Sequence, residues 1–348
     1  MKTRILSILL AICLLMTTVA VLGACTSTNP PADTTQDTST DTNDTASATK
    51  TKVNVMVLNG TTGFGMAPLM DKNAKGEATL DYTFSVETDA SNITAALING
   101  SVDMAALPTN AAAALNAKKN GLIKVIAVNT LGVLYLMTGE GATITSMEDL
   151  RGKTVYCPAQ NPAFILTYLC QANGLEVGTD VIIDTSYAQP ADLRTALVAG
   201  QVDIAVLPEP MVTIAGKAND TLTVALDLTA EWDKCALPGS LAQGCVVVRT
   251  AFAEANPEAV DAFLAEYETS INYVKENPAE AGQMIAAQGV FAQAPVAQAA
   301  IPNCNITFLT GQDMADKLTA FYTVLYGVAP NAVGGNVPDS GLYYIPTK

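Results

Sequence analysis

Short apolar runs and helical stripes alternate along most of this chain. Residues 102–107 and 202–207 are almost entirely apolar over the length of a strand, which is typical of strands buried on both faces of a parallel sheet. Before the first run, Ile93, Ala96 and Leu97 are spaced three and four positions apart, which predicts a helix packed on that sheet. The pattern therefore predicts an α/β protein with helices on both faces of its sheets.

The most informative part of this pattern is a repeat at a spacing of 100 residues. Residues 96–108 are ALINGSVDMAALP and residues 196–208 are ALVAGQVDIAVLP, with Gly, Val, Asp, Ala, Leu and Pro on the same offsets. A strand predicted at 53–58 likewise has a counterpart at 153–157. Several elements in the same order at one offset indicate a duplicated unit. We therefore predict two similar lobes with mainly parallel sheets, and a ligand between them.

Two further apolar stretches, at 131–137 and 245–249, bracket the second copy. We interpret them as strands that cross between the lobes. They predict a discontinuous first lobe at 53–138 and 247–348 and a second lobe at 139–246. After Arg249 the pattern is helical, and one stripe consists of Val260, Phe263, Leu264, Tyr267, Ile271 and Val274.

The start of the chain has the pattern of a secretory signal at 1–24. Lys2 and Arg4 precede an apolar run, and small residues stand before Cys25. The sequence LGAC at 22–25 resembles a bacterial lipobox, whose cysteine carries lipid such as palmitate and becomes the new N-terminus. An uncleaved membrane anchor is the alternative. Residues 26–50 are nearly all small and polar, so we predict that 25–52 is a lipidated cysteine followed by a flexible stalk.

The chain is acidic, with 33 Asp and Glu against 18 Lys and Arg and a formal net charge of −15. This excess argues against nucleic acid as a partner, because binding it needs a basic patch. It also argues against broad electrostatic docking on anionic lipid. We expect the lipid on Cys25 to make the contact with the membrane.

The cysteines do not indicate a metal site. Five remain once Cys13 in the signal and Cys25 are set aside, namely Cys157, Cys170, Cys235, Cys245 and Cys304. None has C-x-x-C spacing, so we expect no zinc cage and no metal. A disulfide between Cys235 and Cys245 and a set of buried free thiols are both open.

Ligands of open parallel sheets gather beyond the carboxyl ends of the strands, next to helix N-termini. Here these positions are the loops at 59–66, 87–92, 108–110, 158–163, 188–190 and 207–210. In one of them, Asn161 has the chemistry of a helix N-cap and Pro162 suits a first turn. The candidate ligand-binding residues are Asn59, Thr61, Thr62, Phe64, Thr109, Asn110, Gln160, Asn161, Gln189, Glu209 and Trp232.

These loops contain no Lys or Arg, whereas Glu209 brings a negative charge. Glu209 would meet a cationic or amino-bearing ligand, with Glu87 or Asp89 as further candidates, or it complements the start of its own helix. Arg194 lies one turn into a helix and either reaches back to the ligand or is solvated. We favour a neutral polar, amino-bearing or aromatic small molecule and keep a sulfonate or other oxyanion as the alternative.

Four aromatic residues are candidates for stacking on a flat ligand, and each has core packing as its alternative. They are Phe64, Phe164, Tyr187 and Trp232.

Several segments together resemble a known family. They are the lipobox, the stalk, DLRGKTV at 149–155, LCQANGL at 169–175 and LPEPM at 207–211. In order and spacing they are similar to the type II periplasmic binding proteins, and within these to the nitrate, sulfonate, taurine and thiamine-precursor branch of ABC-importer receptors. The resemblance covers most of residues 53–275. The loop at 160–163 departs from it, because it lacks the run of small hydroxyls expected of a sulfonate binder.

The resemblance implies a monomeric, extracytoplasmic receptor, anchored to the cell membrane by lipid. Its lobes would close on a small solute by a hinge and present it to ABC permease subunits. A ligand sensor that presents its closed form to a signalling partner is an alternative. Some proteins of this fold are enzymes that make a pyrimidine with a bound cofactor. Because the chain has no His, no nucleophile elbow and no P-loop, we predict no catalytic residues and no cofactor.

Overall fold

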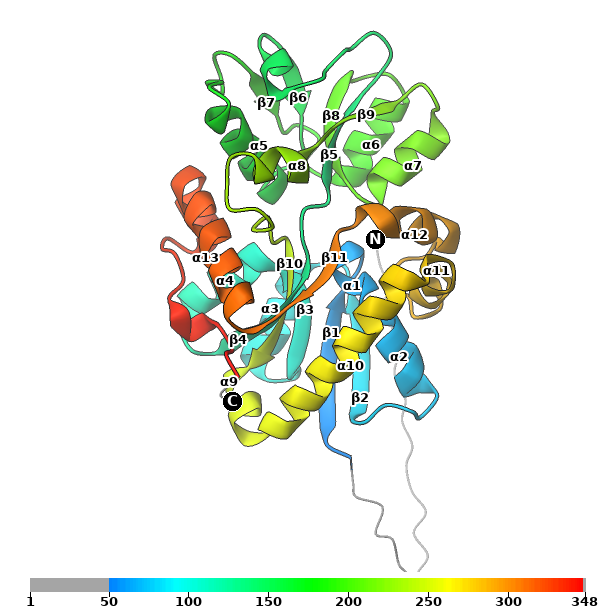
Figure 1. Ribbon diagram of the computed structural model, residues 1–348, viewed down its shortest axis with the longest axis vertical. Coiled ribbons are helices and arrows are strands. Elements are labelled where there is room, and N and C mark those ends of the chain that lie inside the picture. The colour runs from blue at the N-terminus through cyan, green and yellow to red at the C-terminus, as the bar shows by residue number, and fades with distance from the viewer. Residues whose placement is uncertain (1–49, 347–348) are drawn as a thin grey trace, which may run out of the picture. The chain divides into compact units, whose positions relative to one another are not determined.

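Two β-sheets organise the chain in a computed structural model that describes residues 50–346 (Figure 1). The predicted signal at 1–24, the predicted lipidation site at Cys25 and nearly all of the predicted stalk lie outside these residues. Residues from Thr49 onward belong to a single structural unit. Within the described part of the chain, no helix combines the length and the apolar character needed to cross a bilayer.

The first sheet has the strand order β11-β4-β10-β3-β1-β2. Its strands are β1 (Lys52–Leu58), β2 (Asp81–Glu87), β3 (Met104–Pro108), β4 (Ile123–Thr130), β10 (Gly244–Arg249) and β11 (Ile306–Leu309). β1 pairs in parallel with β2 and β3, and β10 pairs antiparallel with both β3 and β4. Strands β1 to β4 therefore run in one direction, and β10 and β11 run in the other.

The second sheet has the strand order β7-β6-β8-β5-β9. Its strands are β5 (Leu134–Thr138), β6 (Thr154–Tyr156), β7 (Ile182–Asp184), β8 (Ile204–Pro208) and β9 (Thr223–Asp227). All of them run in one direction except β5, which is antiparallel to β8 and β9. The predicted α/β fold with mainly parallel sheets is confirmed.

The two sheets repeat one topology. The order β4-β10-β3-β1-β2 in the first corresponds strand by strand to β9-β5-β8-β6-β7 in the second, and β11 is an addition to the first. The two segments with matching sequences include β3 and β8, which both end at a proline that leads into the next helix. We call each sheet with the helices packed on it a lobe.

The helices fill the intervals between these strands. The first lobe holds α1 (Thr61–Phe64), α2 (Ala67–Ala74), α3 (Ala90–Asn99), α4 (Thr109–Lys118), α9 (Thr250–Ala255), α10 (Pro257–Glu276), α11 (Pro278–Ala287), α12 (Ala294–Ala300) and α13 (Gly311–Val328). The second lobe holds α5 (Asn161–Ala172), α6 (Pro190–Val198), α7 (Met211–Ala218) and α8 (Leu228–Asp233). Short 3-10 turns lie at Met147–Leu150, Ile301–Asn303, Pro330–Val333 and Ser340–Leu342.

The chain passes between the sheets in two connectors. The first connector is 131–133, between β4 and β5, and the second connector is 234–243, between α8 and β10. The strands that we expected to cross therefore lie within one sheet each, because β5 pairs with β8 and β9 while β10 pairs with β3 and β4. Strand pairing starts the second sheet at Leu134 and resumes the first at Gly244. The lobe limits given above stay a prediction.

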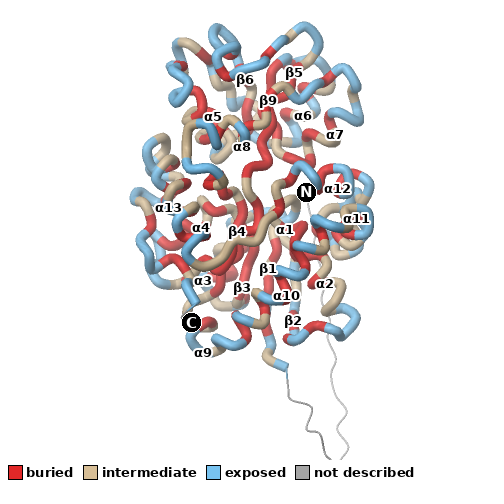
Figure 2. Tube along the Cα trace, viewed as in Figure 1, coloured by how far each residue is buried: buried red, intermediate tan, exposed pale blue. Residues whose placement is uncertain are grey.

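Burial follows the predicted pattern (Figure 2). The strands and the inner helix faces are buried, as in α10, where Val260, Phe263, Tyr267, Ile271 and Val274 face the core and Leu264 is partly exposed. One apolar cluster continues from the first lobe into the second through α13, where Phe321 lies against Trp232. This shared core packs the two lobes together on the α13 side.

Candidate functional site

A cavity of about 280 Å³ lies where the carboxyl ends of strands from both sheets meet. The first lobe supplies the residues at the starts of α1, α3 and α4, and the second lobe supplies the start of α5. Both connectors and the end of β4 contribute to it as well. Its lining residues are Thr61, Thr62, Ala90, Pro108, Asn110, Ala111, Thr130, Val133, Ala159, Gln160, Asn161, Pro162 and Gln243.

The topology explains why these residues meet. In a parallel sheet, the carboxyl ends of adjacent strands share one edge, and the helices that follow begin there. β1 leads into Thr61, β3 into Asn110 and β6 into Gln160. Five of the predicted ligand-binding residues are brought together in this way, namely Thr61, Thr62, Asn110, Gln160 and Asn161.

No residue that lines the cavity carries a charge. The lining instead offers hydroxyl groups from threonines and side-chain amides from Asn110, Gln160, Asn161 and Gln243. The helices α3, α4 and α5 begin at this surface, and the first amide groups of a helix have no acceptor within the helix. The site therefore combines neutral hydrogen-bonding groups with the positive ends of helix dipoles.

The start of α5 differs from the sequence prediction. The helix begins at Asn161, so that Gln160 occupies the N-cap position and no side chain caps the helix. Gln160 has φ of 67°, an unfavourable backbone conformation for a residue with a side chain. Asn161 is thereby released from capping, and its Oδ1 atom is buried without a hydrogen-bond donor.

Sequence reasoning missed Gln243 and Thr130. Gln243 ends the second connector and stands directly before the apolar run of β10, and Thr130 ends β4. Neither belongs to the loops that the repeat pairs. Both could have been found in the sequence as polar residues that stand just before the apolar stretches predicted to cross between the lobes.

Two of the aromatic candidates lie in the core, outside the cavity. Phe64 is fully buried and packs against Phe291, with ring centroids 6.1 Å apart. Trp232 is also fully buried, and its Nε1 donates to Ser240 Oγ at 2.9 Å. Trp232 packs on Phe321 of α13 in the first lobe, a contact between distant segments that sequence periodicity does not reveal.

Thr109, Asn59 and Gln189 also lie outside the cavity lining. Thr109 is fully buried, and its Oγ1 donates to the Ala242 carbonyl at 2.7 Å. Asn59 donates its backbone N–H to the Glu87 carbonyl at 2.7 Å. Gln189 is exposed at the N-cap position of α6.

Glu209 is buried outside the lining, where it joins two elements. Its carboxylate accepts hydrogen bonds from the Thr213 backbone N–H at 3.1 Å and from Thr213 Oγ1 at 3.0 Å, at the start of α7. It also accepts one from Asn303 Nδ2 of the first lobe, at 3.3 Å. Burial raises the pKa of Glu209 above its usual value, and these hydrogen bonds partly oppose the shift. The helix-start alternative is thus the one that the contacts support.

The other charged candidates have local partners. Asp89 caps α3, where it accepts from the Ser91 backbone N–H at 2.8 Å, and this bond lowers the pKa of Asp89. Glu87 accepts from Asn92 Nδ2 at 3.1 Å. Arg194 donates to Thr195 Oγ1 at 3.3 Å. The aromatic candidate Tyr187 packs on Tyr156, and Phe164 is half-buried against the shared core.

The five cysteines of the described residues are free thiols. Cys157, Cys170, Cys245 and Cys304 are buried, and burial raises the pKa of the Cys170 thiol to about 12. The alternative of a disulfide between Cys235 and Cys245 is therefore not realised. Within residues 50–346, no group of three or more potential metal ligands is brought together.

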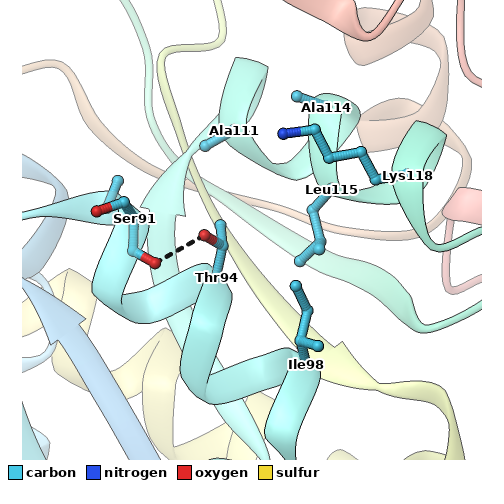
Figure 3. A pocket seen from close by; sticks show the side chains of 8 residues that line it. Ser91, Thr94, Ile98, Ala111, Ala114, Leu115 and Lys118 are labelled. Atoms are coloured by element: carbon cyan, nitrogen blue, oxygen red, sulfur yellow. Dashed lines mark hydrogen bonds between the residues drawn. The ribbon is translucent and has the colours of Figure 1, made fainter.

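A second groove, of about 230 Å³, lies between α3 and α4 (Figure 3). It shares Ala90 and Ala111 with the cavity and continues toward Ile98 and Leu115. It contains one charged residue, Lys118, and a hydrogen bond from Thr94 Oγ1 to the Ser91 carbonyl at 2.9 Å.

Comparison with known proteins matches both the sequence and the fold. The sequence model of a family described as NMT1/THI5 like matches residues 76–281. No curated protein matches the chain. An ABC transporter structure from Parabacteroides distasonis is 24% identical with a TM-score of 0.72, over 86% of this chain and 99% of that one.

Two further similar structures are named for the solutes they bind. The periplasmic aliphatic sulphonate binding protein SsuA of Escherichia coli is 17% identical with a TM-score of 0.67, over 82% of this chain and 94% of its own. The alkanesulfonate-binding protein SsuA of Xanthomonas axonopodis pv. citri, bound to MOPS, is 15% identical with a TM-score of 0.59, over 84% and 96%. At these identities the likeness establishes the periplasmic-binding-protein fold.

Proposed function

Because the chain belongs to the NMT1/THI5-like family, we propose that it is a receptor that captures a small, uncharged polar solute between its lobes for an ABC importer. The observation that carries this proposal is the cavity itself. Both lobes and both connectors line it, and none of the lining residues is charged. A site lined by two lobes is complete only when both lobes contact the solute. A receptor for a permease needs this property, because its closed form then reports that solute is bound.

The charge of the solute follows from the cost of burial. An ion that leaves water for a closed site loses its hydration, and the loss is offset only by a countercharge or by several hydrogen bonds. The cavity has no carboxylate, and Glu209 is already bonded to Thr213 and Asn303. A cationic amine would therefore find acceptors but no countercharge, so the cavity disfavours a cationic ligand.

An oxyanion is the second candidate solute. It is favoured by the starts of α3, α4 and α5 at the cavity, since helix N-termini bind anions through free amide groups. The names of the sulfonate-binding neighbours point the same way. We rank it second because the cavity offers no Arg or Lys to neutralise a full charge.

A thermal-shift screen of residues 49–348 tests the proposal. A ligand that binds only the native state stabilises it by RT ln(1 + [L]/Kd), about 2.7 kcal/mol at 100 times Kd. We expect uncharged polar solutes to raise Tm, sulfonates to raise it less, and amines to leave it unchanged. The Asn161→Ala variant should lower the shift by about half, because a tenfold weaker Kd reduces the stabilisation from about 2.7 to about 1.4 kcal/mol at the same solute concentration. No shift with any class, or the largest shift with amines, would overturn the proposal.

Membrane attachment is a separate part of the proposal. We propose that the mature chain begins at a lipidated Cys25, acts outside the cytoplasm as a monomer and delivers its solute to permease subunits. Cys25→Ser should release the full chain from the membrane fraction and leave solute affinity unchanged. Retention of that variant in the membrane would contradict the lipid anchor.

A further inference from the structure

Gln243 has an unusual position at the junction of the two lobes. Its backbone N–H donates to the Thr130 carbonyl at 2.9 Å, and its carbonyl accepts from the Thr109 N–H at 3.2 Å. Its side-chain Oε1 accepts from the Val133 N–H at 2.7 Å. One residue of the second connector thus fastens the end of β4, the first connector and the start of α4.

The repeat gives this junction a local symmetry. The Thr109 N–H donates to Gln243, and at the equivalent position of the second copy the Glu209 N–H donates to the Val133 carbonyl at 2.9 Å. Gln243 and Val133 are therefore counterparts, each directly before the antiparallel strand of its sheet. The hydrogen bond between them joins the two connectors to each other.

The same side chain lines the cavity. Its Oε1 is committed to Val133, and its Nε2 has no acceptor among the described residues. An amide nitrogen donates and does not accept. On the second-lobe side of the cavity an acceptor lacks a donor, because Asn161 Oδ1 is buried without a hydrogen bond. The site thus has an unpaired donor on the second connector and an unpaired acceptor on the second lobe, and this acceptor is buried until the Asn161 side chain turns toward the cavity.

We propose that these two groups select a solute with an amide-like group, in which a carbonyl and an N–H stand side by side. The solute carbonyl accepts from Gln243 Nε2, and the solute N–H donates to Asn161 Oδ1 once a rotation of the Asn161 side chain exposes that atom to the cavity. Binding then ties the second-lobe wall to the residue that joins the connectors, so Gln243 acts as a positioning residue for the hinge. This inference rests on the proposed function and specifies its solute class.

Three matched probes test the assignment on residues 49–348 by calorimetric titration. Benzamide has both the carbonyl and the N–H, N,N-dimethylbenzamide has only the carbonyl, and benzenesulfonate has acceptor oxygens with a full charge. We expect benzamide to bind about tenfold or more tightly than either of the others, because each leaves Asn161 Oδ1 unpaired.

Two variants assign the two hydrogen bonds separately. Gln243→Glu keeps an acceptor for the Val133 N–H and loses the donor, so we expect both benzamides to weaken about tenfold or more while Tm changes little. Asn161→Ala loses the acceptor, so benzamide should bind no better than its dimethyl derivative. Gln283→Glu, the same change as the first on the exposed face of α11, is the control and should alter neither affinity.

Hydrogen exchange of the Val133 amide tests the coupling to the hinge. Saturating benzamide should slow exchange at Val133 in the wild type, because the bound solute holds the Gln243 side chain in place. Unchanged exchange would show that Gln243 only binds solute. Tightest binding of benzenesulfonate, equal affinity for the two benzamides in the wild type, or binding of none of the three probes would overturn the amide assignment. The proposed function would still stand if solutes of another class shift Tm in the screen, and it falls if none does.

Discussion

Residues 109 and 209 occupy equivalent positions in the two copies of the repeat, directly after the proline that ends a buried strand. Both are buried, and both donate a backbone N–H to the connector residue before an antiparallel strand. Their side chains then diverge. Thr109 bonds to the second connector through Ala242, whereas Glu209 bonds to its own helix and to Asn303 of the other lobe.

The comparison shows where the duplicated unit was altered. In the sequence, the charge of Glu209 is the clearest difference between the two copies. In the structure, its carboxylate accepts hydrogen bonds from Thr213 of its own helix and from Asn303 of the first lobe. The residue that faces the cavity is Asn110, one position after Thr109. In the second copy that position is Pro210, which has no side-chain amide. We therefore expect solute binding to depend on the uncharged difference, Asn110 against Pro210, and not on the charge of Glu209.

The largest effect should come from the first connector. A Cβ at Gly132 would lie 2.2 Å from Thr229 Oγ1 and 2.6 Å from Leu241 Cδ2. Gly132→Ala therefore forces the connector or both neighbours to move, and we expect a loss of about 2–3 kcal/mol in the free energy of unfolding. Urea unfolding measures it. Gly216→Ala, at an exposed helix position with open space, is the control. A loss below about 0.5 kcal/mol would show that the first connector moves easily enough to accommodate the added methyl group.

Thr109→Val should rank next. The substitution keeps the shape of the side chain and removes the hydroxyl that donates to the buried Ala242 carbonyl. An unpaired buried acceptor costs about 1–3 kcal/mol, so we expect about 1–2 kcal/mol of destabilisation by urea unfolding. If the variant lowers solute affinity and leaves the unfolding free energy unchanged, Thr109 is a ligand contact after all.

Asn110→Ala separates binding from stability at the neighbouring position. Asn110 lines the cavity and is half-buried, and none of its side-chain atoms hydrogen-bonds to the described residues. We expect the best solute of the screen to bind about tenfold more weakly, equivalent to about 1.4 kcal/mol. The unfolding free energy without solute should stay within about 0.5 kcal/mol. Calorimetric titration and urea unfolding measure the two quantities, and unchanged affinity would remove Asn110 from the site.

Glu209→Gln should change the free energy of unfolding least at acid pH, and its effect should vary as the pH rises. Burial raises the pKa of Glu209 in the folded chain above the ordinary value of 4.5, so the native state holds this proton more tightly than the unfolded state. Ionisation of Glu209 therefore lowers wild-type stability as pH rises above about 4.5. The difference in unfolding free energy between variant and wild type should therefore move in favour of the variant from pH 4 to pH 7.

Subtracting the two pH profiles isolates Glu209 from the carboxyl groups with lowered pKa, such as Asp89 and Asp180. A profile of the opposite sign would contradict the assigned cause of the shift. Solute affinity should be unchanged in Glu209→Gln, in contrast to Asn110→Ala.

The repeat accounts for most of what the sequence could predict. Matching segments at 96–108 and 196–208 implied matching strand orders, and the two sheets have them. The convergence of Thr61, Asn110 and Gln160 next to helix starts was predictable, because parallel strands leave their carboxyl ends at one edge. These features depend on local periodicity, which a single sequence contains.

The misplaced and missed residues depend on contacts between distant segments. Trp232 packs on Phe321 of α13, nearly ninety positions away in the chain, and Glu209 meets Asn303. Gln243 was missed because the second connector has neither a repeat partner of similar sequence nor a regular pattern. Periodicity predicts which face of an element is buried, but it does not indicate which distant segment covers that face.

We propose that the solute binds in the uncharged cavity between the lobes. A crystal structure of residues 49–348 with the best solute of the screen tests it most directly. We expect the solute to lie between Asn110, Asn161 and Gln243, with no Asp, Glu, Lys or Arg side chain within hydrogen-bond distance of it. A solute whose polar group is bound by the Glu209 carboxylate, or a solute that lies outside the cavity, would show that the uncharged cavity is not the binding site.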